Sequence, residues 1–167
     1  MTETPSQITI RRATAKDASA IWAILEPVFR AGDTYTVDAD IPRKDALAYW
    51  TGGNHTAYLA EADGQVVGTY FLCPNQAGGG AHVCNCGFAT DPDTRGRGVA
   101  RRMLEHALSA ARAADFKAMQ FNFVVSTNDR AIRTWKQYGF AEVGRLPQAF
   151  RHPVEGYVDA LVMYKRL

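Results

Sequence analysis

Residues 89–108 constrain the fold more than any other part of the chain, because a strand, a glycine-rich turn and an amphipathic helix follow one another there without interruption. The strand is expected to end near Thr90, and Asp91-Pro92 sets a turn. Gly96 and Gly98 then precede the helix. Glycines at these places let the backbone curl tightly and approach a ligand, and the helix N-terminus directs unpaired N–H groups to the same point. The segment therefore predicts an anion site, most naturally one for a phosphate.

The glycine spacing excludes two common nucleotide motifs. A P-loop needs Gly-Lys-Ser/Thr at the start of the helix, whereas Gly98 is followed by Val99 and Ala100. A dinucleotide-binding turn needs G-x-G-x-x-G in a first βαβ unit, whereas this turn has the wrong third spacing and lies in the middle of the chain. The phosphate ligand must therefore be of another kind.

The rest of the chain alternates strands and helices. A strand near residues 7–13 leads into a helix for which Thr14 and Asp17 form a capping box. A second helix begins near Pro42, and Asp63-Gly64 marks a hairpin between two strands. After the glycine-rich turn come a long helix, a strand, a helix and two further strands. This order is typical of an α/β mixed sheet layered with helices.

Length and composition favour one ordinary globular domain, residues 1–167, since 47% of the residues are hydrophobic and 22% are charged. A formal net charge of +2 is too small for a dedicated nucleic-acid-binding protein. The sequence has no 18-residue apolar run and no signal-peptide pattern, so no membrane partner is expected and the cytoplasm is the expected location. Three cysteines, Cys73, Cys84 and Cys86, make a disulfide framework unexpected.

The turn also carries the pattern R-x-x-G-x-A, in Arg95, Gly98 and Ala100. This pattern resembles the coenzyme A pyrophosphate turn of the GNAT superfamily of N-acetyltransferases, and the order of elements is similar along the whole chain. The resemblance implies acetyl-CoA as co-substrate and a central mixed sheet of about seven strands flanked by about four helices. By the same resemblance, the coenzyme is held by Phe88, Ala89, Thr90, Arg95, Gly96, Arg97, Gly98, Val99, Ala100, Arg101, Asn128, Ala131 and Trp135.

The predicted helix near residues 128–138 matches the same superfamily with one departure. Asn128 and Ala131 fit its N-x-x-A element. Seven residues after that asparagine the superfamily places a tyrosine that protonates the leaving thiolate, but this chain has Trp135 there, whose indole N–H is not usefully acidic near neutral pH. Tyr138 occupies a usually apolar place, so it is expected to pack rather than to act as an acid.

Two asparagines in predicted central strands are the candidate catalytic residues. Strand alternation places Asn85 on the strand face opposite to that of Cys84 and Cys86. It places Asn122 on the same face as Gln120 and Val124. Asparagine is disfavoured in strands, so both side chains need partners. The pair is similar to that of fungal N-acetyltransferases acting on azetidine-2-carboxylate, in which two asparagines serve the site in place of an acid–base pair. The alternative is that both side-chain amides only satisfy hydrogen bonds in a sheet whose strands splay apart.

One strand face and two polar loops also contain residue types that can bind a ligand. His82, Cys84 and Cys86 share one strand face, but a structural zinc site usually gathers four ligands from spaced turns, so no metal is expected. Two polar loops, residues 32–40 and 147–156, are expected near the end of the sheet. Tyr35, Arg151 and His152 in these loops are the predicted contacts for a substrate carboxylate.

Together these features predict direct transfer of acetyl from acetyl-CoA to the amine of a small amino-acid-like molecule, without an acyl-enzyme intermediate. Transfer needs an amine held near the thioester and a donor for the developing oxyanion, and amide side chains can supply both. Two alternatives stay open: a protein or peptide acceptor, and a coenzyme A binding module without catalysis. The chain could act as a monomer or a homodimer.

Overall fold

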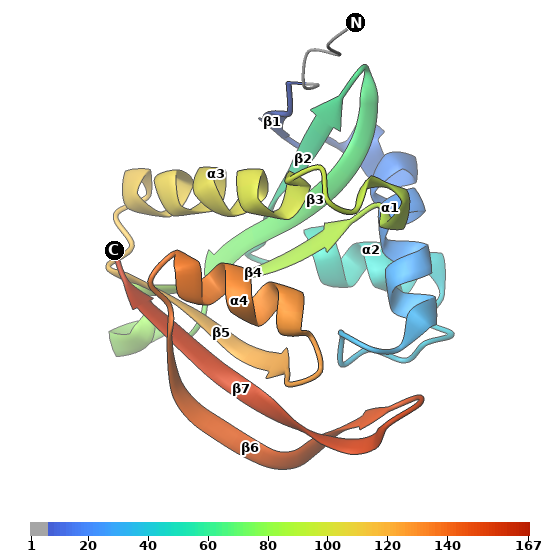
Figure 1. Ribbon diagram of the computed structural model, residues 1–167. Coiled ribbons are helices and arrows are strands. Elements are labelled where there is room, and N and C mark those ends of the chain that lie inside the picture. The colour runs from blue at the N-terminus through green and yellow to red at the C-terminus, as the bar shows by residue number, and fades with distance from the viewer. Residues whose placement is uncertain (1–6) are drawn as a thin grey trace, which may run out of the picture.

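The computed structural model describes residues 7–167, and Figure 1 shows a twisted sheet with helices on both sides. The strands are β1 (Thr9–Arg12), β2 (Thr56–Ala62), β3 (Gln65–Pro74), β4 (Val83–Thr90), β5 (Ala118–Val125), β6 (Ala141–His152) and β7 (Gly156–Arg166). The α-helices are α1 (Ala18–Ala31), α2 (Arg43–Thr51), α3 (Val99–Ala113) and α4 (Asp129–Gln137), and short 3-10 turns are η1 (Ala15–Asp17), η2 (Gly78–Gly80) and η3 (Pro92–Thr94). The predicted seven-stranded mixed architecture is therefore confirmed.

The sheet divides in its middle. The strand order is β1-β2-β3-β4-β5-β7-β6, and of these neighbours only β4 and β5 run parallel. These two strands pair at Val83↔Ala118 and Cys84↔Met119 and nowhere further along. Figure 1 shows them diverging beyond that point. The sheet is thus closed where β4 and β5 begin and open where they end.

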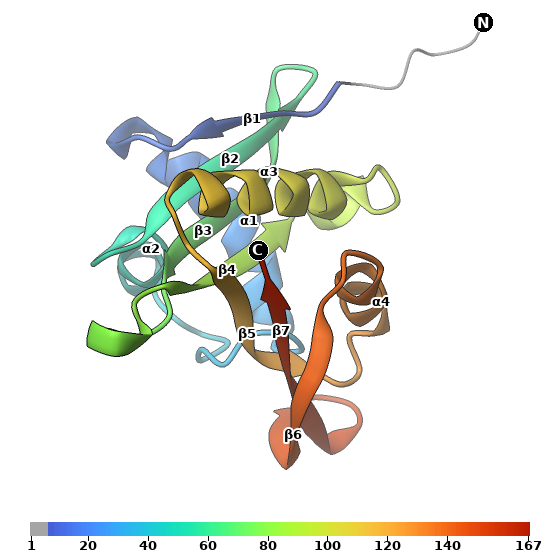
Figure 2. The ribbon, with the colours of Figure 1, turned by 90° about the vertical axis from the view of Figure 1, so that its left-hand side faces the viewer.

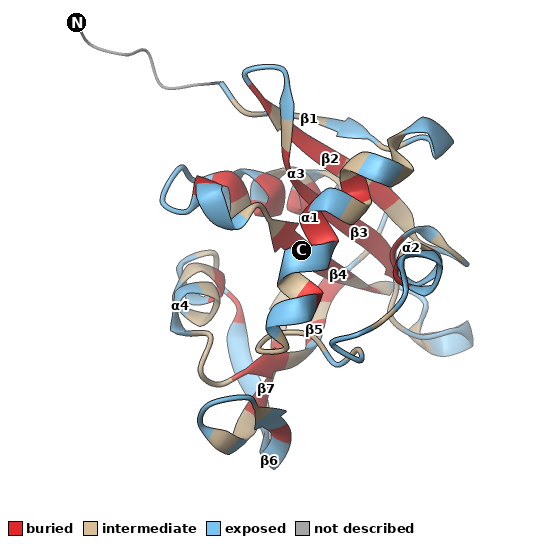
Figure 3. Ribbon diagram, turned by 90° about the vertical axis from the view of Figure 1, so that its right-hand side faces the viewer, coloured by how far each residue is buried: buried red, intermediate tan, exposed pale blue. Residues whose placement is uncertain are grey.

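Two hydrophobic cores lie on opposite faces of the sheet. On one face α1 and α2 bury Leu25 and Trp50 against Phe71. On the other face α3 and α4 bury Met103 and Trp135 against strand residues. Figure 2 shows α3 in front of the sheet with α1 behind it, and in Figure 3 the buried residues concentrate on the central strands and the inner sides of α1 and α3. Each pair of helices therefore packs against one face of the sheet, beside the place where β4 and β5 separate.

Local sequence signals explain several element boundaries. The capping box forms, since the Thr14 amide donates to the Asp17 carboxylate at 2.7 Å just before α1. Gly32 ends α1 in the left-handed region, with φ of 66°. At the β2–β3 turn Asp63 and Gly64 have φ of 53° and 75°, as a tight hairpin with two positive φ values requires. The predictions of the capping box and of the hairpin are confirmed.

Two predictions from strand patterning are wrong. The loop expected over residues 147–156 is strand as far as His152, because a register shift between Leu146 and Phe150 lets β6 pass Pro147 and resume pairing with β7. In β5 a second register shift falls between Phe121 and Val124. Asn122 is exposed whereas Val124 is buried, so the expected common face ends at Asn122.

Candidate functional site

A cleft of about 1180 Å³ opens between the diverging ends of β4 and β5. It runs from the glycine-rich turn before α3, past the N-terminal part of α4, to the segment after α1. Most of the predicted site residues line it: Asn85, Phe88, Ala89, Thr90, Arg95, Gly96, Gly98, Val99, Ala100, Arg101, Asn122, Asn128, Ala131, Trp135, Tyr35 and His152. Arg97 and Arg151 do not belong to this lining.

The glycine-rich turn presents bare backbone to the cleft. Gly96 and Gly98 have φ of 82° and 78°, a conformation that side chains with a Cβ rarely adopt. A Cβ at either position would have no protein atom within 4 Å, so the space beside the turn is open. Gly98 is the N-cap of α3 and no side chain caps it, which leaves the first N–H groups of the helix without acceptors. Helix N-terminus and turn together form a nest for an anion.

The arginines of the turn have different surroundings. Arg95 lines the cleft and forms no ion pair within residues 7–167. Arg101 also lines it, and its guanidinium donates to Gln137 at 2.9 Å. Arg97 instead pairs with Asp63 in the β2–β3 turn at 3.3 Å, so it braces the turn from outside. Arg130 and Arg133 of α4, which sequence reasoning missed, add two cations to the lining.

The open edge of β4 contains Phe88, one of the residues predicted to contact the coenzyme through the backbone. The Tyr35 hydroxyl donates to the carbonyl oxygen of Phe88 at 2.6 Å. That carbonyl therefore points away from β3, and the N–H of the same residue points with it, because both groups of one strand residue face one edge. Tyr35 packs edge-on against Phe29 and Trp50 at 5.3 and 5.7 Å, and burial raises the pKa of its phenol well above the ordinary value. Tyr35 thus serves as a fixed neutral donor, already engaged with β4.

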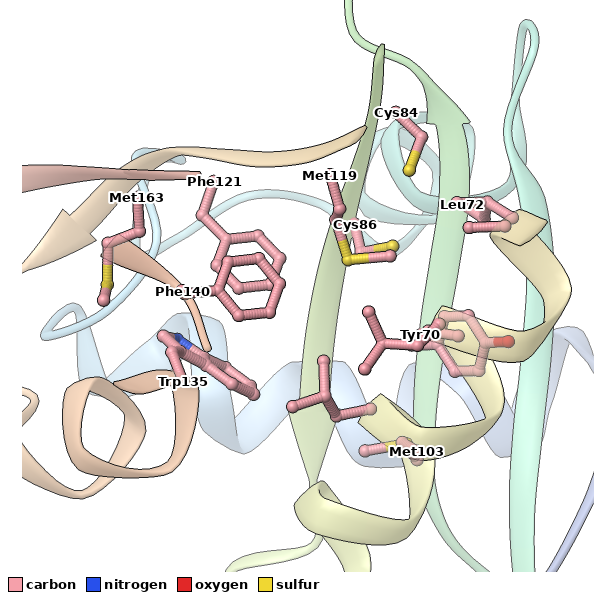
Figure 4. Packing of buried hydrophobic residues seen from close by; sticks show 14 of the residues in the cluster. Tyr70, Leu72, Cys84, Cys86, Met103, Met119, Phe121, Trp135, Phe140 and Met163 are labelled. Atoms are coloured by element: carbon pink, nitrogen blue, oxygen red, sulfur yellow. The ribbon is translucent and has the colours of Figure 1, made fainter. Parts of the chain in front are cut away.

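The N-x-x-A residues form the first turn of α4. Asn128 is the N-cap of α4, and its side-chain oxygen accepts from the Ala131 amide at 3.4 Å. Trp135, one turn further, is buried between Phe121 and Phe88, with ring centroids 5.0 and 5.3 Å apart. Figure 4 shows its indole beside Phe121 and Phe140. Trp135 therefore forms an aromatic wall of the cleft.

Tyr138 lies outside the cleft lining. Its hydroxyl donates to a Glu105 carboxylate oxygen at 2.6 Å, which links α4 to α3, and the Arg101 guanidinium lies 5.8 Å from its ring centroid. The hydrogen bond to the carboxylate raises the pKa of the Tyr138 phenol and lowers that of Glu105. This geometry supports a packing role rather than proton transfer.

The two candidate catalytic asparagines lie where the strands separate. Asn85 directly follows the last β4–β5 pair, and its amide nitrogen donates to the backbone oxygen of Gln120 at 2.9 Å. This side-chain bond takes the place of a backbone hydrogen bond between β4 and β5, which is missing because the two strands separate there. Asn122 donates to Oδ1 of Asn75 at 2.6 Å and accepts from Nε2 of Gln120 at 2.9 Å. The cleft is therefore floored by amides that are held in place, and both the catalytic and the structural roles are compatible with these bonds.

The three predicted carboxylate contacts do not converge. Tyr35 is engaged with Phe88, and Arg151 is exposed outside the cleft lining. His152 lines the cleft, and its Nδ1 accepts from the amides of Val154 and Glu155, both at 3.1 Å. Since Nδ1 accepts, the ring proton resides on Nε2, and His152 offers one N–H donor. Tyr49 and Thr127 line the cleft too, but neither was predicted as a site residue.

The cysteines are buried thiols without disulfides. Burial, followed by a hydrogen bond with Cys84, raises the pKa of Cys86 well above its ordinary value. Within residues 7–167 no group of three His, Cys, Asp or Glu side chains is placed to hold a metal ion. None of the helices in that range is long and apolar enough to cross a membrane.

Comparison with known proteins extends these observations. Residues 19–140 match the model of the acetyltransferase (GNAT) family. The N-acetyltransferase aca1 of Schizosaccharomyces pombe is 36% identical over 98 residues, which are 58% of this chain and 47% of that protein. The amino-acid acetyltransferase of Ralstonia nicotianae is 28% identical over 95% of this chain and 32% of its own length. The chain thus spans less than half the length of these two relatives.

Solved structures extend the similarity to nearly the whole chain. A GCN5-related N-acetyltransferase from Kribbella flavida has a TM-score of 0.90 and 35% identity, covering 96% of this chain and 98% of its own. A phosphinothricin acetyltransferase from Sinorhizobium meliloti, solved in complex with acetyl-CoA, has a TM-score of 0.84 at 18% identity, covering 96% of this chain and 88% of its own.

Proposed function

This chain belongs to the acetyltransferase (GNAT) family, and from that membership we propose that it transfers acetyl from acetyl-CoA to the amine of a small amino-acid-like molecule. One observation carries the proposal. The uncapped glycine-rich turn and the two fixed asparagines open into the same cleft, so an anion site and a polar floor lie along one continuous hollow. That arrangement suits a long ligand with phosphates at one end and a reactive group at the other.

Residues along the cleft would contact the coenzyme over its length. Backbone amides of Gly96 and of residues 98–101 would hold the pyrophosphate, with Arg95 adding charge. The outward N–H of Phe88 would bond the pantetheine arm as an added strand would. Trp135 would pack against the arm. Acetyl-CoA supplies an acetyl group already activated as a thioester.

Positioning by neutral groups would then account for the chemistry. The amine attacks the acetyl carbonyl, the C–N bond forms as the C–S bond breaks, and the amine proton passes to water. Asn122 and Asn85 would orient the amine and donate to the developing oxyanion. Trp135 supplies no acid, and a thiolate leaves readily enough near neutral pH without one. Because the pKa of Cys86 is raised, its thiol stays protonated, which supports direct transfer over an acyl-enzyme.

We propose a proline analogue such as azetidine-2-carboxylate as the acceptor. The pair of strand asparagines and the similarity to a fungal N-acetyltransferase support this choice, and the amino-acid acetyltransferase similarity supports a small amino-acid-like acceptor more generally. The Nε2–H of His152 is the available donor for the substrate carboxylate. Four arginines and two aspartates line the cleft, so it is not the acidic groove that a protein N-terminus or a lysine side chain would favour.

Assembly and location are proposed on separate grounds. β6 is an edge strand and exposes apolar side chains, among them Val143 at 61% and Leu146 at 39%. This exposed edge supports a homodimer, which size-exclusion chromatography with light scattering would detect. Three free thiols support a reducing compartment such as the cytoplasm.

Thiol release from acetyl-CoA across a panel of amines tests the function. The panel contains azetidine-2-carboxylate, proline and a lysine-bearing peptide. We expect release with the first, and Asn122→Ala should lower kcat by more than about tenfold while Tyr138→Phe stays within a few fold. Tight acetyl-CoA binding without release for any amine would instead establish a non-catalytic binding module. Release with the peptide alone would establish a protein acceptor.

A further inference from the structure

We infer that Asn75 and Gln120 are positioning residues that fix which way the Asn122 carboxamide faces. The inference rests on the proposed function, because it gives Asn122 a task in acetyl transfer. Three side-chain amides are joined by two consecutive hydrogen bonds. Gln120 Nε2 donates to Asn122 Oδ1 at 2.9 Å, and Asn122 Nδ2 donates to Asn75 Oδ1 at 2.6 Å.

The series has a direction. Gln120 donates to Asn122, and Asn122 donates to Asn75, so the Asn122 oxygen is held toward Gln120 and one of its N–H bonds toward Asn75. The side-chain amide of asparagine has two nearly equivalent orientations related by a half turn, which exchange donor and acceptor. Two bonds of opposite kind select one orientation. The N–H that remains is then a defined donor for an oxygen in the cleft.

The supporting residues stand behind the site rather than in it. Asn122 lines the cleft, whereas Asn75 and Gln120 are not part of the lining. Asn75 directly follows β3, and Gln120 lies two residues before Asn122 on β5. The Asn122 side chain is therefore held by residues from two different parts of the chain. The Asn85 side chain bonds the Gln120 backbone at 2.9 Å and anchors the start of the series. Successive bonds of this kind polarise one another, which strengthens the free N–H as a donor.

Two isosteric substitutions separate the effect of the hydrogen-bond direction from the effect of an added negative charge. In Asn75→Asp the new carboxylate still accepts from Asn122, so the direction is kept. In Gln120→Glu the new carboxylate cannot donate, so Asn122 must turn its N–H toward position 120 and its oxygen toward Asn75, which reverses the series. Both variants place one negative charge beside Asn122, so each controls for the other.

We expect Asn75→Asp to keep kcat within about threefold and Gln120→Glu to lower it about tenfold or more, as for a misplaced transition-state hydrogen bond. The KM for acetyl-CoA should change little in either, because neither residue lines the cleft. Equal losses in the two variants, or a larger loss in Asn75→Asp, would overturn the inference.

A second measurement is independent of turnover. The side-chain amide NMR signals of Asn122, recorded with coenzyme A present, should shift in opposite directions in the two isosteric variants. Asn75→Ala and Gln120→Ala should each shift them as well. If no amine is acetylated but these shifts occur, the proposed function fails and the positioning series stands. If acetylation occurs and the signals are unchanged in all four variants, the series is refuted and the function stands.

Discussion

Replacing Gly98 by alanine tests the anion nest against a matched position elsewhere. Gly98 has φ of 78° and Gly64, in the β2–β3 turn, has φ of 75°, and a Cβ at either position meets no protein atom within 4 Å. Forcing an alanine into this left-handed region costs roughly 1–2 kcal/mol at each position. At about 2–4 °C per kcal/mol for a domain of this size, both variants should lose a similar few degrees of melting temperature.

The two variants should differ in coenzyme binding. Gly98 faces the cleft, so its new methyl group should hold the pyrophosphate away from the turn amides and weaken one charge-assisted hydrogen bond, at about 1.5–3 kcal/mol. The dissociation constant for coenzyme A, measured by calorimetry, should rise about 10- to 100-fold in Gly98→Ala. Gly64→Ala should bind as the wild type does. An unchanged constant in Gly98→Ala, or an equal loss in both variants, would refute the nest.

Three further outcomes are expected. Burial lowers the pKa of His106, whose Nδ1 lies 2.7 Å from the Tyr70 hydroxyl. The unfolded chain therefore binds more protons than the folded one, so the free energy of unfolding should fall as the pH drops below about 6.5. In His106→Gln, urea unfolding should show a weaker dependence of this free energy on pH. Trp135→Ala should lower the free energy of unfolding by about 3–5 kcal/mol, because the indole is buried against Phe121 and Phe88, and a loss below about 1 kcal/mol would contradict that packing. Acetyl-CoA added without amine should leave the protein mass unchanged, since a buried Cys86 thiol with a raised pKa is a poor nucleophile, and an acetylated species would disprove direct transfer.

Features set by local backbone chemistry could be predicted from the sequence. The glycine-rich turn, the capping box at Thr14 and the hairpin at Asp63-Gly64 each depend on a few consecutive residues. Strand alternation likewise placed Asn85 correctly relative to its neighbours. Of the residues predicted to take part in binding or catalysis, all but Arg97 and Arg151 line the cleft.

Features set by distant partners could not be predicted in the same way. Arg97 looked equivalent to Arg95 in the motif, but its partner Asp63 lies 34 residues earlier. Asn75 is 47 residues from Asn122 and carries no motif, so the amide series between them was missed. The register shift after Phe121 depends on pairing with β7, which is why simple alternation failed there.

The division between β4 and β5 is also a division along the chain. Every strand on one side precedes residue 91 and every strand on the other follows residue 117, so the two halves are consecutive lengths of polypeptide. Their sheets meet at two residue pairs at one end only. A small rotation about that end would change the width at the far end most, without breaking a ladder bond within either half. Beyond Cys84 and Met119 the width of the cleft is therefore set by side-chain packing between two consecutive lengths of chain, and not by a backbone ladder.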